Sequence, residues 1–184
     1  MDTNIQKNGI SLHWTAGTYL PNGLELSHYH GGVSWDGHTA RYAKWNDYTA
    51  NLPHTWNRNA DLIGLTICGM AGANTKNFGR YPVREEQIEE LCLACAEVAY
   101  LKKIQVANCR THAEWALIDG YGPQSGDPET RWDLGILKPG ACTPSIARKT
   151  GDYLRSKIRE YKLELIDGKR KIRELHFENK TLGV

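Results

Sequence analysis

The chain lacks an excess of charge of either sign. Its 23 Lys and Arg residues against 21 Asp and Glu residues leave a formal net charge of +2. Proteins whose main partner is a nucleic acid usually carry a concentrated basic patch and a much higher isoelectric point. The near balance therefore argues against a nucleic acid as the principal partner.

The sequence also lacks a long apolar run. A membrane-spanning helix needs about 18 or more consecutive apolar residues, and none of the 184 residues begins such a stretch. Residues 1–10 show no positive segment followed by an apolar one, so we expect no secretory signal peptide. We therefore expect synthesis in a cytoplasm and no stable membrane insertion. If the protein acts outside the membrane, another factor must carry it across.

Cysteine is sparse, and its count is odd. The chain has five cysteines, and free thiols are the default for a protein made without a signal peptide. Cys92 and Cys95 form a C-x-x-C pair, a spacing that can serve zinc or redox chemistry. The pair lies inside a strongly helical pattern without a second such pair, so we interpret both residues as small core residues.

Short apolar runs alternate with helical patterns, which predicts an α/β (α+β) fold with a mixed central β-sheet flanked by helices. The length favours one main domain, which we place at residues 1–161. The turn signal Asp167-Gly168 is compatible with a β-hairpin within the tail, residues 162–184, packed on the same domain. Strands are expected at 8–14, 28–35, 62–69 and 104–110, a strand or loop at 38–48, loops at 15–27 and 117–130, and helices at 84–103 and from Thr143 to about 161.

Two histidines and one aspartate carry the strongest chemical signal: His13 in SLHWTAG, His112 in CRTHAEWA and Asp133 in TRWDLG. Imidazole and carboxylate both suit Zn²⁺, and three protein ligands leave a fourth position open for water. Zinc lowers the pKa of such a water to about 7, which makes a nucleophile at neutral pH. The pattern predicts a metal-dependent hydrolase. Asp119 and Asp127 are rival third ligands, unless they serve only as turn residues.

Five segments, in chain order, resemble one family: SLHWTAG, HYHGGV, NADLIG, THAEWA and RWDLG. They are similar to the zinc-dependent N-acetylmuramoyl-L-alanine amidases of type 2, over about residues 9–160. That family includes phage endolysins, peptidoglycan-recycling amidases and peptidoglycan-recognition proteins. The resemblance implies a type 2 amidase-like fold, zinc held by His13, His112 and Asp133, and cleavage of the amide between N-acetylmuramic acid and L-alanine in peptidoglycan or muropeptides.

Departures from the family pattern favour its endolysin branch. Recycling amidases carry a catalytic Glu where this chain has Thr66, whereas the endolysin branch lacks that Glu and uses Tyr and Lys. Tyr29 matches the Tyr, and Arg131 stands where Lys is usual. The resemblance thus implies catalytic roles for Tyr29 and Arg131. Leu134 replaces the common Pro of the third-ligand motif.

We expect three further residues to contact the substrate: His54, Asn59 and Trp14, with core packing as the alternative for Trp14. The expected protein is a monomeric phage or prophage endolysin that reaches the cell wall after membrane permeabilisation. The alternatives are a cytoplasmic muropeptide-recycling amidase, a non-catalytic peptidoglycan-binding module and a zinc hydrolase of another amide.

Overall fold

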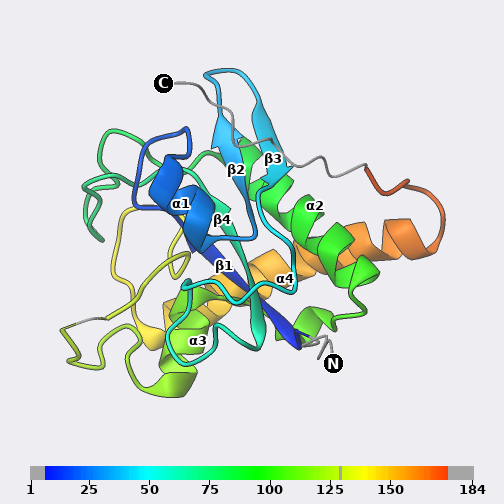
Figure 1. Ribbon diagram of the computed structural model, residues 1–184. Helices are drawn as coiled ribbons and strands as arrows, with labels where there is room; N and C mark the ends of the chain where they lie inside the picture. The colour runs from blue at the N-terminus through cyan, green and yellow to red at the C-terminus, as the bar shows by residue number, and fades with distance from the viewer. Residues whose placement is uncertain (1–6, 129, 174–184) are drawn as a thin grey trace.

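The computed structural model describes residues 7–128 and 130–173. These residues are built around one five-stranded sheet, and helices flank it (Figure 1). The strand order is β3-β2-β4-β1-β5, with β1, β2, β4 and β5 parallel and β3 antiparallel to β2. The predicted mixed central sheet flanked by helices is confirmed. The strands are β1 (Gly9–Trp14), β2 (Gly31–Trp35), β3 (Ala40–Lys44), β4 (Leu62–Ile67) and β5 (Cys109–Thr111).

Two of the three inner strands, β1 and β4, are buried at every residue. Parallel strands covered by other elements on both faces read as nearly continuous apolar runs, which is how GISLHW and LIGLTI appear in the sequence. The carboxyl ends of the four parallel strands meet at one edge of the sheet. Ligand sites of open α/β sheets form beyond this edge.

The long helices α2 (Glu85–Leu101) and α4 (Pro144–Ile166) pack against each other. Helix α2 also contacts β2, β3 and β4, and α4 contacts β5 and the short helix α3 (His112–Asp119). Leu91 of α2 and Leu154 of α4 belong to the same buried apolar cluster as the central strands, as do Cys92 and Cys95. None of the helices in the described part of the chain is both long and apolar enough to cross a membrane.

The segment 15–27, expected as a loop, contains the start of helix α1 (Gly23–His28). The Asn22 side chain accepts hydrogen bonds from the backbone N–H groups of Leu24 and Glu25, and the Glu25 side chain accepts from the Asn22 N–H. This reciprocal capping satisfies backbone donors that a helix start otherwise leaves unpaired. Strand β2 consequently begins three residues later than expected.

The segment before the second histidine also differs from expectation. A 3₁₀ turn (Val106–Asn108) occupies the middle of the expected strand 104–110, and β5 has only three residues. Lys103 has a positive φ of 56°, which turns the chain out of α2 before it can rejoin the sheet. Helix α3 occupies the start of the expected loop 117–130.

The expected β-hairpin in the tail is wrong for its first arm, because α4 continues to Ile166. Buried Leu165 extends the apolar stripe of Ile158 by nearly two helical turns. Gly168 then adopts a φ of 68°, the left-handed conformation that commonly ends helices. An Asp-Gly pair is thus a helix stop here rather than a hairpin turn. Residues 169–173 form no strand, and residues 174–184 of the expected hairpin lie outside the described residues.

Candidate metal centre

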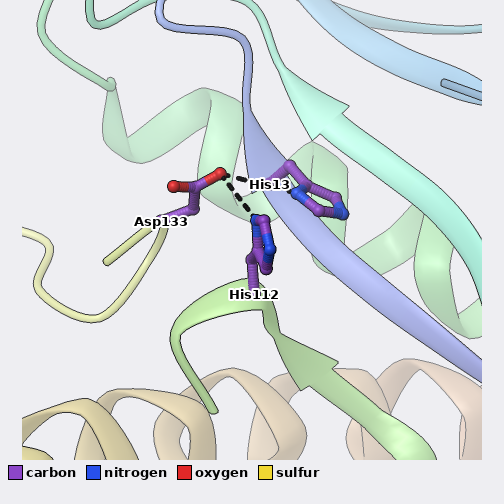
Figure 2. Close-up of side chains that lie close together, drawn as sticks. All are labelled: His13, His112 and Asp133. Atoms are coloured by element: carbon purple, nitrogen blue, oxygen red, sulfur yellow. Dashed lines mark hydrogen bonds and ion pairs between the residues drawn. The ribbon is translucent and has the colours of Figure 1, made fainter. Parts of the chain in front are cut away.

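The three residues expected as metal ligands lie together at the carboxyl edge of the sheet (Figure 2). The Nδ1 atoms of His13 and His112 lie 3.5 Å and 3.2 Å from Oδ2 of Asp133. One donor atom from each residue falls within 4.8 Å of the other two. Over residues 7–128 and 130–173, no other group of three His, Cys, Asp or Glu side chains is so placed. The cluster could therefore hold a metal ion.

Strand register brings the two histidines side by side. Strand β1 pairs with β5 in parallel, with Leu12 opposite Thr111. The next residues along the chain are His13, still in β1, and His112, which directly follows β5, so the two imidazoles lie side by side. His13 ends up completely buried, and the two ring centroids lie 4.6 Å apart.

His112 is the first residue of α3, and the start of this helix is tightly held. Thr111 Oγ1 accepts a hydrogen bond from the Glu114 N–H, and Glu114 Oε2 accepts from the Thr111 N–H. Arg155 of α4 donates two hydrogen bonds to the buried Glu114 carboxylate, at 2.8 Å and 2.7 Å. A third bond from Arg155 reaches the Cys109 carbonyl. A buried ion pair thus fixes the start of α3, which carries His112, to α4.

Asp133 lies in a loop docked on the same helix start. Its carbonyl accepts a hydrogen bond from the Ala113 N–H. The next residue, Leu134, is fully buried and has a φ of 55°. Proline fixes φ near about −65°, so this backbone does not admit the Pro that the amidase motif commonly has there. The substitution noted in the sequence therefore follows from the path of the loop.

The rival acidic residues lie away from the cluster. Asp119 receives two hydrogen bonds of 2.6 Å from the Arg58 guanidinium, which occupies its carboxylate. Asp127 is exposed. Of the three acidic candidates, only Asp133 lies within reach of His13 and His112.

His13 and Asp133 are held in the protonation states that bind a cation. Burial, followed by the neighbouring His112, lowers the pKa of His13 to about 4, so its imidazole is neutral at pH 7. Burial alone would raise the pKa of Asp133, but the neighbouring His112 side chain, which contacts Oδ2 at 3.2 Å, together with the nearby His13, outweighs burial and holds that pKa well below its usual range. Neutral imidazole and ionised carboxylate are the forms that coordinate metals.

An orphaned nitrogen supplies the test of fit. Within the described part of the chain, the buried Nδ1 of His13 has no hydrogen-bond partner. Buried polar atoms without a partner are rare in native proteins. A cation held between His13, His112 and Asp133 would satisfy this atom, so the donor set fits a metal ion.

A cavity of about 380 Å³ opens over the cluster. Its wall includes Tyr29, the residue that caps the carboxyl end of α1, and Arg131, two positions before Asp133. The Tyr29 ring lies 5.2 Å from the His13 ring, centroid to centroid. Burial first, and then the Asp133 charge, raises the pKa of Tyr29, so its hydroxyl stays protonated. The structure therefore places both expected catalytic side chains in the wall of the cavity that opens over His13, His112 and Asp133.

The three residues expected to contact the substrate are engaged in contacts within the protein. Trp14 is 4% exposed and packs edge-on against Trp132 at 4.6 Å, although it borders the cavity. Asn59 Oδ1 accepts hydrogen bonds from the backbone N–H groups of His54 and Thr55. His54 also borders the cavity, but its ring nitrogens contact Thr55 and the backbone of β4. Thr55 was not identified from the sequence, where nothing marks it except its place after His54.

Comparisons with known proteins find likeness only at the level of structure. No family model and no curated protein matches the sequence. A structure of PlyL superposes with a TM-score of 0.54 at 13% identity, covering 83% of this chain and 84% of PlyL. An E90A mutant of PlyL gives 0.51 at 14% identity, covering 84% and 85%. The chain therefore shares the fold of PlyL over more than four fifths of its length.

Proposed function

We propose that the protein is a peptidoglycan hydrolase, a zinc-dependent N-acetylmuramoyl-L-alanine amidase of the phage endolysin type. The observation that carries the proposal is the cluster of His13, His112 and Asp133 under an open cavity in an amidase-like fold. Two His and a carboxylate are among the donor sets of catalytic zinc sites. The cleaved bond, between N-acetylmuramic acid and L-alanine, comes from the family resemblance of the motifs around these ligands.

The proposed metal is Zn²⁺, held by His13, His112 and Asp133. When bound, zinc supplies Lewis-acid polarisation of the scissile carbonyl and activation of water. Tyr29 keeps its proton because of its burial, so its hydroxyl can donate a hydrogen bond to the scissile carbonyl. The proton that the leaving amine takes up comes from Tyr29 or from the attacking water. The Arg131 guanidinium stabilises the negative charge that develops on the carbonyl oxygen.

Two features set this proposal above its alternatives. At the position where recycling amidases carry a catalytic Glu, Thr66 is completely buried in β4 and offers no carboxylate. This favours intact cell wall over soluble muropeptides as the substrate. A module that only binds peptidoglycan does not need a metal site. The presence of His13, His112 and Asp133 in one cluster therefore favours catalysis.

Replacing Arg131 separates catalysis from metal binding. We expect Arg131→Ala to lower turnover by about 10²–10³-fold, the usual loss for one donor to a developing oxyanion, and to leave the zinc content at wild-type level. Arg131→Lys should recover part of the activity, since it restores a cation of the type usual in the family. Release of dye-labelled peptidoglycan, with metal analysis of the same samples, measures both effects. Loss of zinc in Arg131→Ala would contradict the assignment.

The proposed function is tested with purified peptidoglycan, with and without a chelator, followed by mass spectrometry of the soluble products. Stem peptides with a free N-terminal alanine, absent with chelator and restored by zinc, are the expected result. Release from soluble muropeptides but not from intact wall would support the recycling enzyme. Binding to the wall without peptide release would overturn the hydrolase and leave the binding module.

A further inference from the structure

A chain of three buried contacts connects the backbone of β4 to His13. His54 Nε2 lies 3.1 Å from the Leu62 carbonyl oxygen, and His54 Nδ1 lies 2.9 Å from the Thr55 hydroxyl. The same hydroxyl lies 3.2 Å from His13 Nε2. Thr55 is 1% exposed and His54 is 7% exposed, so water does not compete for these contacts.

The hydrogen bonds in this series of contacts can run in only one direction. A carbonyl only accepts, so His54 Nε2 must carry a hydrogen and donate to Leu62. His54 is buried against a carbonyl and a hydroxyl, neither of them charged, so its ring is neutral and its Nδ1 has no hydrogen. Thr55 must then donate its single hydrogen to His54. The Thr55 oxygen is left to accept, and the hydrogen it receives comes from His13 Nε2.

The consequence falls on the opposite nitrogen of His13. A neutral imidazole with its hydrogen on Nε2 has a bare lone pair on Nδ1. This is the orphaned atom of the cluster, 3.5 Å from Asp133 Oδ2 and outside the usual hydrogen-bond range of about 2.7–3.2 Å. The side of His13 that faces the cluster is therefore prepared to bind a cation before any cation arrives.

We propose that His54 and Thr55 are positioning residues that hold His13 in the Nε2–H tautomer, with Nδ1 directed at the metal site. The proposal rests on the metal site of the proposed function, and it gives His54 a role other than substrate contact. Partners of this kind behind a metal-binding histidine set its tautomer and orientation.

The surroundings of the two residues are built to hold them in place. Asn59 clamps the backbone N–H groups of His54 and Thr55 with its one carbonyl oxygen, at 3.0 Å and 2.7 Å. Gly64 of β4 lies directly against the His54 ring, where a Cβ atom would come within 2.5 Å of Cγ. A glycine is therefore required for the ring to reach Leu62. His112 has a simpler arrangement, in which its Nε2 lies 3.4 Å from the Tyr121 hydroxyl.

Histidine nitrogen NMR of the metal-free wild-type protein tests the tautomer directly, with the His13 signals assigned by their loss in His13→Asn. We expect His13 to carry its hydrogen on Nε2 and to keep Nδ1 bare. A hydrogen on Nδ1 of His13 in the wild-type protein would overturn the proposal. This measurement needs no variant of Thr55 to fold.

The variant Thr55→Val removes the hydroxyl and keeps the shape of the side chain. We expect the His13 tautomer to shift toward Nδ1–H and zinc affinity to fall about 10–100-fold, the usual cost of losing such a partner, measured by competition with a chromophoric chelator. Thr55→Ser should restore both. Thr66→Val, a buried threonine on the strand beside His13, is the matched control and should change neither.

An unchanged His13 tautomer, or wild-type zinc affinity, in folded Thr55→Val would overturn the proposal. These measurements use only zinc and the protein, so their failure differs from that of the proposed function. A wild-type protein that binds zinc with the expected tautomer but releases no peptide would sink the hydrolase and leave the positioning role intact.

Discussion

Asp133→Ala is expected to abolish both zinc retention and peptidoglycan hydrolysis. Asp133 is the only carboxylate in the described cluster, and its removal leaves two imidazoles to hold the ion. Loss of a partner behind a ligand already costs about 10–100-fold in metal affinity, so loss of the ligand itself should cost more than about 100-fold. Metal analysis after dialysis, together with the release of dye-labelled peptidoglycan, measures the two effects.

Asp127→Ala is the matched control for this prediction. Asp127 belongs to the same long connection between α3 and α4, but it is exposed. We expect wild-type zinc content from this variant. If Asp127→Ala lost zinc and Asp133→Ala retained it, the third ligand would be misassigned and the loop would have to rearrange on metal binding.

The sequence was most informative where a residue's role follows from its neighbours in the chain. The apolar runs of β1 and β4 marked these strands as buried, and Thr143-Pro144 marked the start of α4, where the Thr143 side chain does cap the helix. His13 and His112 could be selected because each ends or follows a strand. Their closeness depends on the parallel register of β1 with β5, which only the structure supplies.

The errors came from signals with two meanings. Asp167-Gly168 fits both a hairpin turn and a helix stop, and only the continued burial at Leu165 separates the two. Asn22 and Glu25 form a capping box, but proline and glycine beside Asn22 favoured a loop. Thr55 could not be found from the sequence, because its contact with His13 spans 42 residues and depends on the tertiary fold.

Of the substitutions proposed for this protein, Arg155→Met is expected to cause the largest loss of stability. Glu114 is 3% exposed, and its carboxylate is bonded to both the start of α3 and the Arg155 guanidinium. Removing one partner of a buried ion pair leaves the other charge without compensation and costs about 3–5 kcal/mol. For a chain of this size that corresponds to a melting temperature lower by roughly 6–20 °C, measurable by thermal denaturation.

The matched control is Arg148→Met, since Arg148 lies on the same helix but is exposed; we expect it to change stability by less than about 0.5 kcal/mol. The double variant Glu114→Gln with Arg155→Met removes both charges and should recover part of the loss. Because Glu114 also fixes the helix start that carries His112, Arg155→Met should weaken zinc binding as well. If Arg155→Met lowered the stability by the expected amount and left the zinc affinity unchanged, the ion pair would support the fold without positioning His112.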